Sequence, residues 1–330
     1  MIFKLLQISF CGIIFTYIKI YAHRKIRSIK EFLVVKIAIV TDSTSDITVQ
    51  EASDNNISIL PIPVIIDNHT YLDNIDISTK QLFDMQRNGS GFPQTSQPVL
   101  GDTMALFDKL HNSGYDAIIV ITLASTISGF FQTVNTISSE HPEYNIIPYD
   151  SGITVRLMGY LALTAARLAK KGSTPKEIID HLDALSSTID EIFVVDDLKN
   201  LVRGGRLSNA SAFVGSMLQI KPLLTFDDQS HKDDQSHKIV SFDKVRSMKR
   251  ALKKTISLAE DKINLVNENQ DLRIMIYHSN DIQGAEYLFE YFKEAYPQNN
   301  IEIQEFDPVI ATHLGEKALG VTWIKDIDKM

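Results

Sequence analysis

The sequence contains very little cysteine: Cys11 is the only one among 330 residues. A single thiol cannot form an intrachain disulfide or a multi-cysteine metal site, and disulfides are rare in the reducing cytoplasm. We therefore expect a cytoplasmic protein without disulfides. Its 44% hydrophobic and 22% charged residues are typical of a globular protein with a substantial core.

The commonest signatures of nucleotide-binding and hydrolytic enzymes are also missing. No G-x-x-x-x-G-K-[ST] loop and no G-x-G-x-x-G turn follows a predicted strand. The nucleophile elbow G-x-S-x-G is absent, as are the metal-ligand spacings H-E-x-x-H and C-x-x-C. We therefore predict no metal and no cofactor, although these absences do not exclude an enzyme.

Positive charge is scarce beyond the N-terminal segment. Residues 1–35 hold six basic side chains against Glu31, a balance of +5, so with a net charge of −8 the other 295 residues carry −13. An acidic body repels phosphate backbones, which argues against a nucleic-acid partner.

The N-terminal segment has three interpretations. Residues 5–22 are mostly apolar and are followed by the basic stretch HRKIRSIK. The segment could be a membrane anchor with a cytoplasmic basic flank, a cleaved signal peptide without a clear cleavage site, or a stretch upstream of a translation start near residues 33–35. We treat residues 1–35 as an extension. Membrane contact is expected to be transient, or to occur through this extension if it is translated.

After residue 35, short β-rich runs alternate with amphipathic stretches. Residues 36–40, KIAIV, and residues 116–123, DAIIVITL, are each followed by a candidate helix and then by another apolar run. This alternation is typical of a doubly wound, mostly parallel sheet. A second unit begins near EIFVVDDLKNL, so we predict an α/β fold with two domains, residues 36–188 and residues 189–330.

A tandem repeat interrupts the second unit. The hexapeptide DDQSHK occurs twice between Phe226 and Ile239 without an apolar residue, which predicts a solvated loop between two hairpin strands. Metal binding by His231 and His237 is the weaker interpretation, because identical polar copies are typical of a duplication.

Hydroxyl-rich segments occur at three places where a strand or loop ends. TDSTSD (residues 41–46) follows IAIV, TSQP (residues 95–98) follows a glycine-rich loop, and TLASTISG (residues 122–129) follows AIIVI. Each alone would be read as a helix cap. Together at the carboxyl edge of a parallel sheet they favour a hydrogen-bonding site for an anion such as a carboxylate. We predict a strand in PVIATHLG (residues 308–315) that ends at His313. This histidine is either part of the anion site or a structural residue.

Seven motifs resemble, in this order, those of the DegV family: IAIVTDSTSDI, TSQP, STISGFFQT, DLKNLVRGGRLS, IKPLLTF, KVRSMKRAL and PVIATHLGEKALG, which span residues 36–324. The resemblance implies a bacterial two-domain α/β protein, with a mixed sheet in the C-terminal domain and a ligand tunnel between the domains. It implies one bound long-chain fatty acid such as palmitate. It also implies presentation of the carboxylate to a fatty acid kinase, which makes acyl phosphate for phospholipid synthesis.

The resemblance also implies site residues. The carboxylate contacts of the family match Thr95, Ser128 and His313, with Ser96 and Gly129 in support.

Two arginines are matched to other roles. Arg246 in KVRSMKRAL corresponds to a residue implicated in docking the kinase. Arg206 in GGRL is expected to have a structural or interfacial role, also facing a partner.

Elementary energetics agree with a carrier. Burial of each methylene contributes roughly 0.8 kcal/mol, so a palmitate-length chain gains on the order of 10 kcal/mol. Residues 157–169 and 210–220 mix small and large apolar side chains that could line a tunnel, although core packing explains most of them better. Two hydroxyls and a protonated His313 would bind an acid without activating it. The alternative is a serine-dependent hydrolase or transferase acting on a lipid through Ser128 and His313.

Five positions depart from the family pattern. Phe130 follows the Ser-Gly motif, Gly152 and Val155 replace the usual lysine and serine, and Glu316 and Lys317 lie in a turn that usually has more glycine. We expect these changes to affect the acyl preference or the kinase partnership more than the fold.

Overall fold

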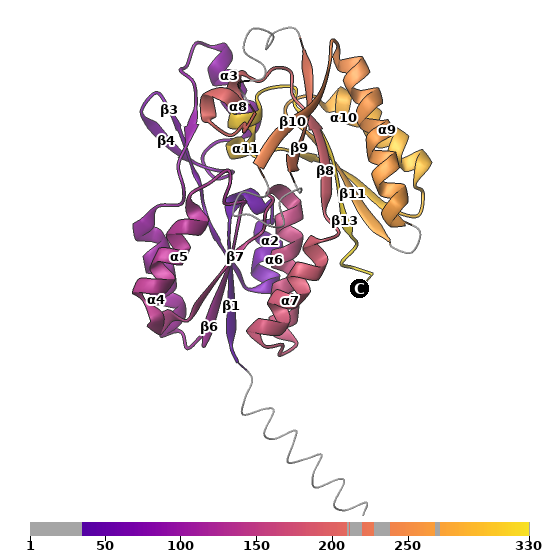
Figure 1. The fold of residues 1–330 in the computed structure, drawn as a ribbon. Coiled ribbons are helices and arrows are strands. Elements are labelled where there is room, and N and C mark those ends of the chain that lie inside the picture. Colours follow the sequence, from indigo (N-terminus) through magenta and orange to yellow (C-terminus); the bar gives the residue numbers. More distant parts are fainter. Residues whose placement is uncertain (1–34, 210, 212–219, 228–237, 268–270, 330) are drawn as a thin grey trace, which may run out of the picture.

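The computed structural model describes residues 35–209, 211, 220–227, 238–267 and 271–329, which form two large sheets and one small sheet with helices packed around them (Figure 1). The strands are β1 (Ile37–Asp42), β2 (Ile57–Leu60), β3 (Pro63–Ile66), β4 (His69–Leu72), β5 (Gln94–Thr95), β6 (Ala117–Thr122), β7 (Ile146–Asp150), β8 (Asp190–Val194), β9 (Lys221–Asp227), β10 (Lys238–Val245), β11 (Leu272–His278), β12 (Asn300–Glu305) and β13 (Leu319–Lys325). The α-helices are α2 (Val49–Asn55), α3 (Thr79–Arg87), α4 (Leu100–Asn112), α5 (Phe130–Glu140), α6 (Val155–Lys170), α7 (Pro175–Ser186), α8 (Lys199–Gly204), α9 (Met248–Asn267), α10 (Ile282–Ala295) and α11 (Pro308–Leu314), and short 3₁₀ turns occur at η1 (Ser43–Ser45) and η2 (Pro142–Tyr144).

The first large sheet is parallel, with strand order β2-β1-β6-β7. Every residue of β1 and β6 is buried, as expected for central strands whose two faces are both covered by helices. Helices α4 and α5 lie on one side of this sheet, and α2, α6 and α7 lie on the other (Figure 1). The predicted doubly wound parallel sheet is confirmed.

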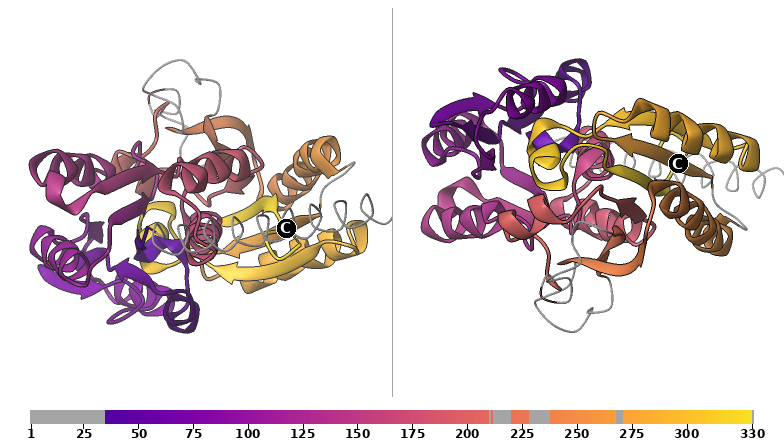
Figure 2. Two further views of the ribbon diagram at one scale, coloured as in Figure 1. Left: turned by 90° about the horizontal axis from the view of Figure 1, so that it is seen from below. Right: turned by 90° about the horizontal axis from the view of Figure 1, so that it is seen from above.

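The second large sheet is mixed, with strand order β10-β9-β8-β13-β11-β12. Only β11 and β12 among these neighbours run parallel, and the other described pairs are antiparallel. Helices α9 and α10 cover one face and form their own apolar core with it (Figure 2). The opposite face carries Phe193 and Tyr277, which together with Phe306 just after β12 belong to the same core as the first sheet. The predicted mixed sheet is confirmed.

Helix α6 joins the two sheets. The hydroxyl of Tyr277 on β11 accepts a bond from the backbone N–H of Arg156 (2.9 Å) and donates to Asp46 (3.1 Å). Tyr160, one turn further along α6, donates to Glu302 on β12 (2.9 Å). The second sheet therefore packs against a helix of the first unit, while the division into residues 36–188 and 189–330 stays a prediction.

The segment around His313 differs from its predicted structure. It is the helix α11 and not a strand: Asp307 accepts a bond from the N–H of Ile310 (2.8 Å) as the N-cap, and Pro308 occupies the first turn. A short apolar run such as Val309–Ala311 has no periodicity that separates a strand from a helix. Asp307 as the N-cap and Pro308 in the first turn favour the helix over the strand.

The predicted hairpin around the tandem repeat is confirmed, because β9 and β10 pair antiparallel with Lys238 opposite Asp227. Residues 228–237, with both histidines of the proposed metal interpretation, lie outside the described residues, as do residues 1–34. No helix within the described ranges is long and apolar enough to cross a membrane. No group of three or more histidine, cysteine, aspartate or glutamate side chains in that part of the chain is arranged so that it could hold a metal ion.

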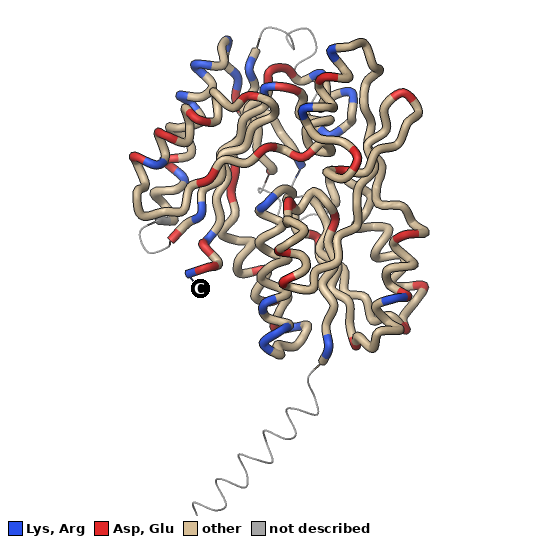
Figure 3. Tube along the Cα trace, turned by 180° about the vertical axis from the view of Figure 1, so that it is seen from behind, with Lys and Arg blue, Asp and Glu red and all other residues tan. Residues whose placement is uncertain are grey.

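Basic and acidic residues are interspersed along the outer helices (Figure 3). Lys80 pairs with Asp84 on α3, and Lys176 pairs with Asp180 on α7, each at 2.6 Å and one turn apart. Such exposed pairs each contribute only a few tenths of a kcal/mol and are typical of a solvated helix face. The absence of a nucleic-acid partner stays a prediction.

Candidate functional site

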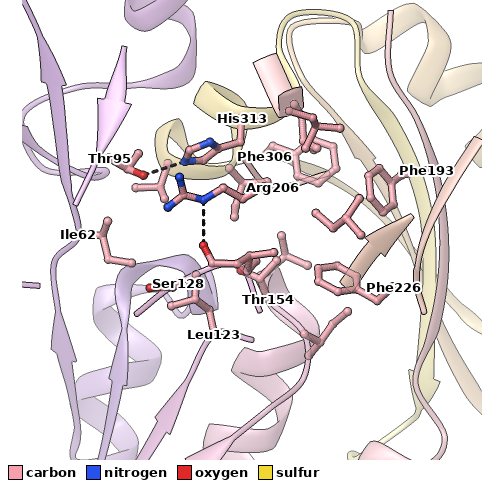
Figure 4. A pocket seen from close by; sticks show the side chains of 18 of the residues that line it. Ile62, Thr95, Leu123, Ser128, Thr154, Phe193, Arg206, Phe226, Phe306 and His313 are labelled. Atoms are coloured by element: carbon pink, nitrogen blue, oxygen red, sulfur yellow. Dashed lines mark hydrogen bonds between the residues drawn. The ribbon is translucent and has the colours of Figure 1, made fainter. Parts of the chain in front are cut away.

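A mostly apolar cavity of about 310 Å³ lies between the parallel sheet and the mixed sheet (Figure 4). Ile62, Leu123 and Leu157 line it from the first unit, and Phe193, Phe226 and Phe306 line it from the second. This volume is at the lower end of the range of small-molecule sites. The cavity is therefore large enough for a small apolar ligand.

The two apolar segments considered as tunnel walls, residues 157–169 and 210–220, contribute few described residues to the cavity lining. Leu157 lines the cavity, whereas Met158, Leu161 and Ala165 pack in the core of α6. Most of residues 210–220 lies outside the described residues. The preference for core packing over tunnel wall is confirmed for the described part of α6.

One end of the cavity is polar and contains the residues predicted for the carboxylate. Thr95 in β5, Ser128 before α5 and His313 in α11 all line it, as do Ser96 and Gly129. The structure thus brings together five side chains or backbone positions from three separate parts of the sequence. Their individual roles in ligand binding stay predictions.

His313 is held against Thr95. Its Nε2 lies 2.7 Å from the Thr95 hydroxyl oxygen, and its Nδ1 has no hydrogen-bond partner among the described residues. Because Nδ1 faces no acceptor, we place the proton of the neutral ring on Nε2, which then donates to Thr95. The hydroxyl hydrogen of Thr95 remains free to donate into the cavity.

The surroundings of His313 determine its charge state. Burial, and then the charge of Arg206, lower the pKa of His313 to about 4. The ring is therefore neutral at neutral pH in this structure, so the charge-assisted bond that a protonated His313 could add is not present here. His313 orients Thr95 and does not itself supply a positive charge.

Ser128 has a free donor as well. Its hydroxyl oxygen accepts a bond from the backbone N–H of Phe130 (3.3 Å), so its hydrogen can point into the cavity. Gly129 is the N-cap of α5, an eleven-residue helix, and lines the cavity. The N-terminal end of a helix carries a partial positive charge, which favours an anion at this place.

Arg206 is the residue that the sequence did not place at the site. Gly205, at φ +72°, ends α8 in the left-handed region and redirects the chain, so that the side chain of Arg206 lines the cavity (Figure 4). Its Nε donates to the carbonyl of Ile127 (3.1 Å). Among the described residues that line the cavity, it alone is an arginine or lysine. The GGRL pattern was the available signal, because a glycine that ends a helix reverses the path of the next residue.

Arg246 lies elsewhere. It is exposed in the turn between β10 and α9 and does not line the cavity. Its role in docking a kinase, like that of Arg206, stays a prediction.

The hydroxyl-rich segment at residues 41–46 forms hydrogen bonds to the backbone of residues that line the cavity. Asp42 accepts bonds from the N–H (3.1 Å) and hydroxyl (2.6 Å) of Thr44 and from the N–H of Leu123 (3.0 Å). The hydroxyl of Ser43 accepts a bond from the N–H of Ile62 (3.0 Å). Leu123 and Ile62 line the cavity, so this segment caps a turn and fixes the wall.

Four buried aspartates lie close to one another near the residues 41–46 segment. Asp42 is the last residue of β1, Asp46 follows η1, Asp73 follows β4, and Asp307 caps α11, which carries His313. Burial raises the pKa of Asp42 to about 6 and the pKa values of Asp46 and Asp73 to about 7. Burial, and then the neighbouring carboxyl groups, hold the pKa of Asp307 well above its usual range. Like charges that share one buried site cannot all ionise.

This cluster makes stability depend on pH. The folded pKa values exceed the unfolded value of 3.8, so the folded state retains protons that the unfolded chain has released. Their stabilising contribution is complete below the unfolded pKa and is lost as pH rises through about 6 to 7 and above. Asp307→Asn, which keeps the N-cap, should flatten this loss by up to about 1.4 kcal/mol per pH unit.

Urea unfolding of the wild type and Asp307→Asn between about pH 5 and pH 8 measures the difference. The depressed pKa of His313 acts in the opposite direction at acid pH, but it is common to both proteins and cancels in the comparison. Stability curves that stay parallel over the whole range would contradict the assignment.

The five departures from the family pattern are spread over the molecule. Val155 alone of the five lines the cavity, and Phe130 is buried in the core under α5. Glu316 forms an ion pair with an arginine of α3. Gly152 and Lys317 lie in turns with positive φ, at 66° and 65°. Val155 is therefore the departure whose side chain can directly affect what the cavity accepts.

Comparisons with known proteins agree with this architecture. The family model described as "Uncharacterised protein, DegV family" matches residues 36–326. A DegV domain-containing protein of Listeria innocua is 38% identical over 288 residues, which cover 87% of this chain and 98% of the relative.

Two solved structures are similar over nearly their whole length. One is DegV of Bacillus subtilis, described as a fatty acid binding protein, with 36% identity, a TM-score of 0.77, and coverage of 88% of this chain and 100% of that chain. The other is a fatty acid binding DegV family protein of Streptococcus agalactiae, with 32% identity, a TM-score of 0.79, and coverage of 88% and 99%. The chain thus belongs to the DegV family.

Proposed function

We propose that this protein binds one long-chain fatty acid, such as palmitate, with the acyl chain along the apolar cavity and the carboxylate at its polar end. Thr95 and Ser128 donate their hydroxyl hydrogens to the carboxylate, and His313 orients Thr95 for this bond. The observation that carries the proposal is the convergence of these hydroxyl groups at one end of a mostly apolar cavity. The fatty acid binding described for the relatives of Bacillus subtilis and Streptococcus agalactiae supports it.

The energetics divide between the two ends of the ligand. The buried chain supplies most of the affinity, at roughly 0.8 kcal/mol per methylene. Arg206 and the N-terminal end of α5 keep the carboxylate ionised and fix its position. No described group at this end activates the acid, which supports a carrier rather than a catalyst.

The alternative of a serine-dependent hydrolase or transferase lacks its general base. His313 Nε2 contacts Thr95 and not Ser128, and no described carboxylate bonds to Nδ1 to orient the ring. A serine nucleophile requires both contacts. No observation of the site favours this alternative.

The proposal extends to a partner. The bound carboxylate is presented to a cytoplasmic fatty acid kinase, which forms acyl phosphate for phospholipid synthesis, and the exposed Arg246 contacts that kinase. Its place outside the cavity is compatible with a role in docking and not in ligand binding.

A coupled assay with a bacterial fatty acid kinase, ATP and palmitate tests this proposal. The carrier alone should form no product, and the carrier with the kinase should yield palmitoyl phosphate. Arg246→Glu should reduce product formation at least about tenfold, because it reverses a charge at the contact, while palmitate affinity stays unchanged. Product formed by the carrier alone, or palmitate affinity lost with Arg246→Glu, would contradict the assignment of roles.

A further inference from the structure

Glu191 is a buried carboxyl group in the wall of the same cavity, and the proposed function does not use it. It is 6% exposed and lies on β8, two residues before Phe193 and on the same face of the strand. The backbone N–H of Phe226 bonds to it, and Figure 4 shows Phe226 across the cavity from Thr95. Glu191 therefore lies on the side of the cavity remote from Thr95.

Only one oxygen of Glu191 is satisfied by the protein. Its Oε1 accepts bonds from the N–H of Phe226 (2.7 Å) and the hydroxyl of Thr225 (2.9 Å). Its Oε2 has no hydrogen bond within the described residues. Burial, and then the charge of Asp190, raise the pKa of Glu191 to about 8, so the group is a neutral acid with an O–H to donate at neutral pH. The Oε2 atom is not itself buried, so a ligand group or water can reach it.

The surroundings of Glu191 restrict the kind of ligand group. A second cleft of about 710 Å³ meets the cavity at Glu191, Phe226 and Ile153. Its lining includes Asp150, Asp183, Asp190 and Asp227 but, among described residues, only Lys262 as a cation. This negative surrounding disfavours a second carboxylate and accepts a neutral hydroxyl group.

We propose that Glu191 recognises a hydroxyl group on the remote part of the acyl chain, so that hydroxylated long-chain fatty acids are preferred ligands. The ligand hydroxyl accepts a hydrogen bond from the O–H group at Oε2 and takes the place of water there. This inference rests on the proposed function, because it concerns the other end of the same ligand.

Competition binding to the delipidated full-length protein tests the inference. The ligands are palmitate, its ω-hydroxy derivative, its mid-chain hydroxy derivative, and hexadecanedioic acid. An unpaired hydroxyl in an apolar site would weaken binding about tenfold. In the wild type at least one hydroxy acid should instead bind at least about threefold more tightly than palmitate, and the diacid should bind more weakly than either.

Two variants identify the residue responsible. Glu191→Gln keeps an acceptor for Phe226 and a donor for the ligand, so it should retain the preference. Glu191→Met has a similar volume and no hydrogen bond, so it should prefer palmitate. If Glu191→Met does not fold, the wild type and Glu191→Gln still decide the question.

The outcomes separate this inference from the proposed function. Palmitate binding without a preference for any hydroxy acid, or a preference that persists in Glu191→Met, overturns the role of Glu191 but not fatty-acid binding. Water would then satisfy Oε2. Failure of every ligand to bind overturns the proposed function itself.

Discussion

Replacing Thr95 by valine and Ser128 by alanine is expected to weaken palmitate binding by about 2 kcal/mol or more, roughly thirtyfold. Each change removes one hydroxyl donor from the polar end of the cavity. Valine has the shape of threonine, so the wall is preserved, and Ser128 contributes only one long bond to the turn before α5. Isothermal titration of the delipidated proteins measures the change.

Two controls isolate the carboxylate. Hexadecanol has the same chain without the acid, so its affinity should fall much less than that of palmitate. Thr136→Val with Ser139→Ala makes the same chemical changes on the exposed part of α5, where both hydroxyls donate to carbonyl groups of the helix. That variant should bind palmitate like the wild type. Unchanged palmitate affinity in the Thr95 and Ser128 variant would refute the carboxylate site.

Gly159→Ala is expected to destabilise the protein by about 3 kcal/mol or more, although alanine is the better helix former by about 1 kcal/mol. A Cβ at this position would lie 2.2 Å from the carbonyl oxygen of Ser45 and 3.3 Å from the side chain of Ile47. The Ser45 carbonyl is backbone, so it cannot rotate away. Helix α6 would have to move, and with it Val155 and Leu157 in the cavity wall.

Gly101→Ala is the matched control. Gly101 lies in the first turn of α4, is exposed, and has no atom within 4 Å of the position of a Cβ. The same substitution should there stabilise the protein by roughly 0.5–1 kcal/mol. Urea unfolding compares the two variants. A Gly159→Ala protein as stable as the wild type would show that α6 does not pack on η1 as described.

The sequence predicts the parallel sheet well because its signal is local. The fully apolar runs of β1 and β6 are long enough to identify central strands without tertiary information. The structure of α11 was not predictable in the same way, because its apolar run is too short to show a period. Asp307 and Pro308 were the informative residues, as the cap and the first turn.

In the candidate site, too, a residue could be predicted only where a recognisable sequence pattern surrounds it. Thr95, Ser128 and His313 could be assigned through the family resemblance, since each lies in a recognisable motif. Arg206 and Glu191 could not, because a charged residue in a turn or at the start of a strand is ordinarily read as solvent-exposed. For Glu191 a signal was present: it is spaced by two residues from Phe193 on β8 and by four from Val195 just after the strand, and both are buried.

The most direct test of the account is native mass spectrometry of the protein purified without detergent, followed by solvent extraction of the ligand. We predict one bound long-chain fatty acid per chain, and its identity reports the acyl preference and any hydroxyl group. An empty protein that also fails to take up added palmitate or oleate would contradict the account.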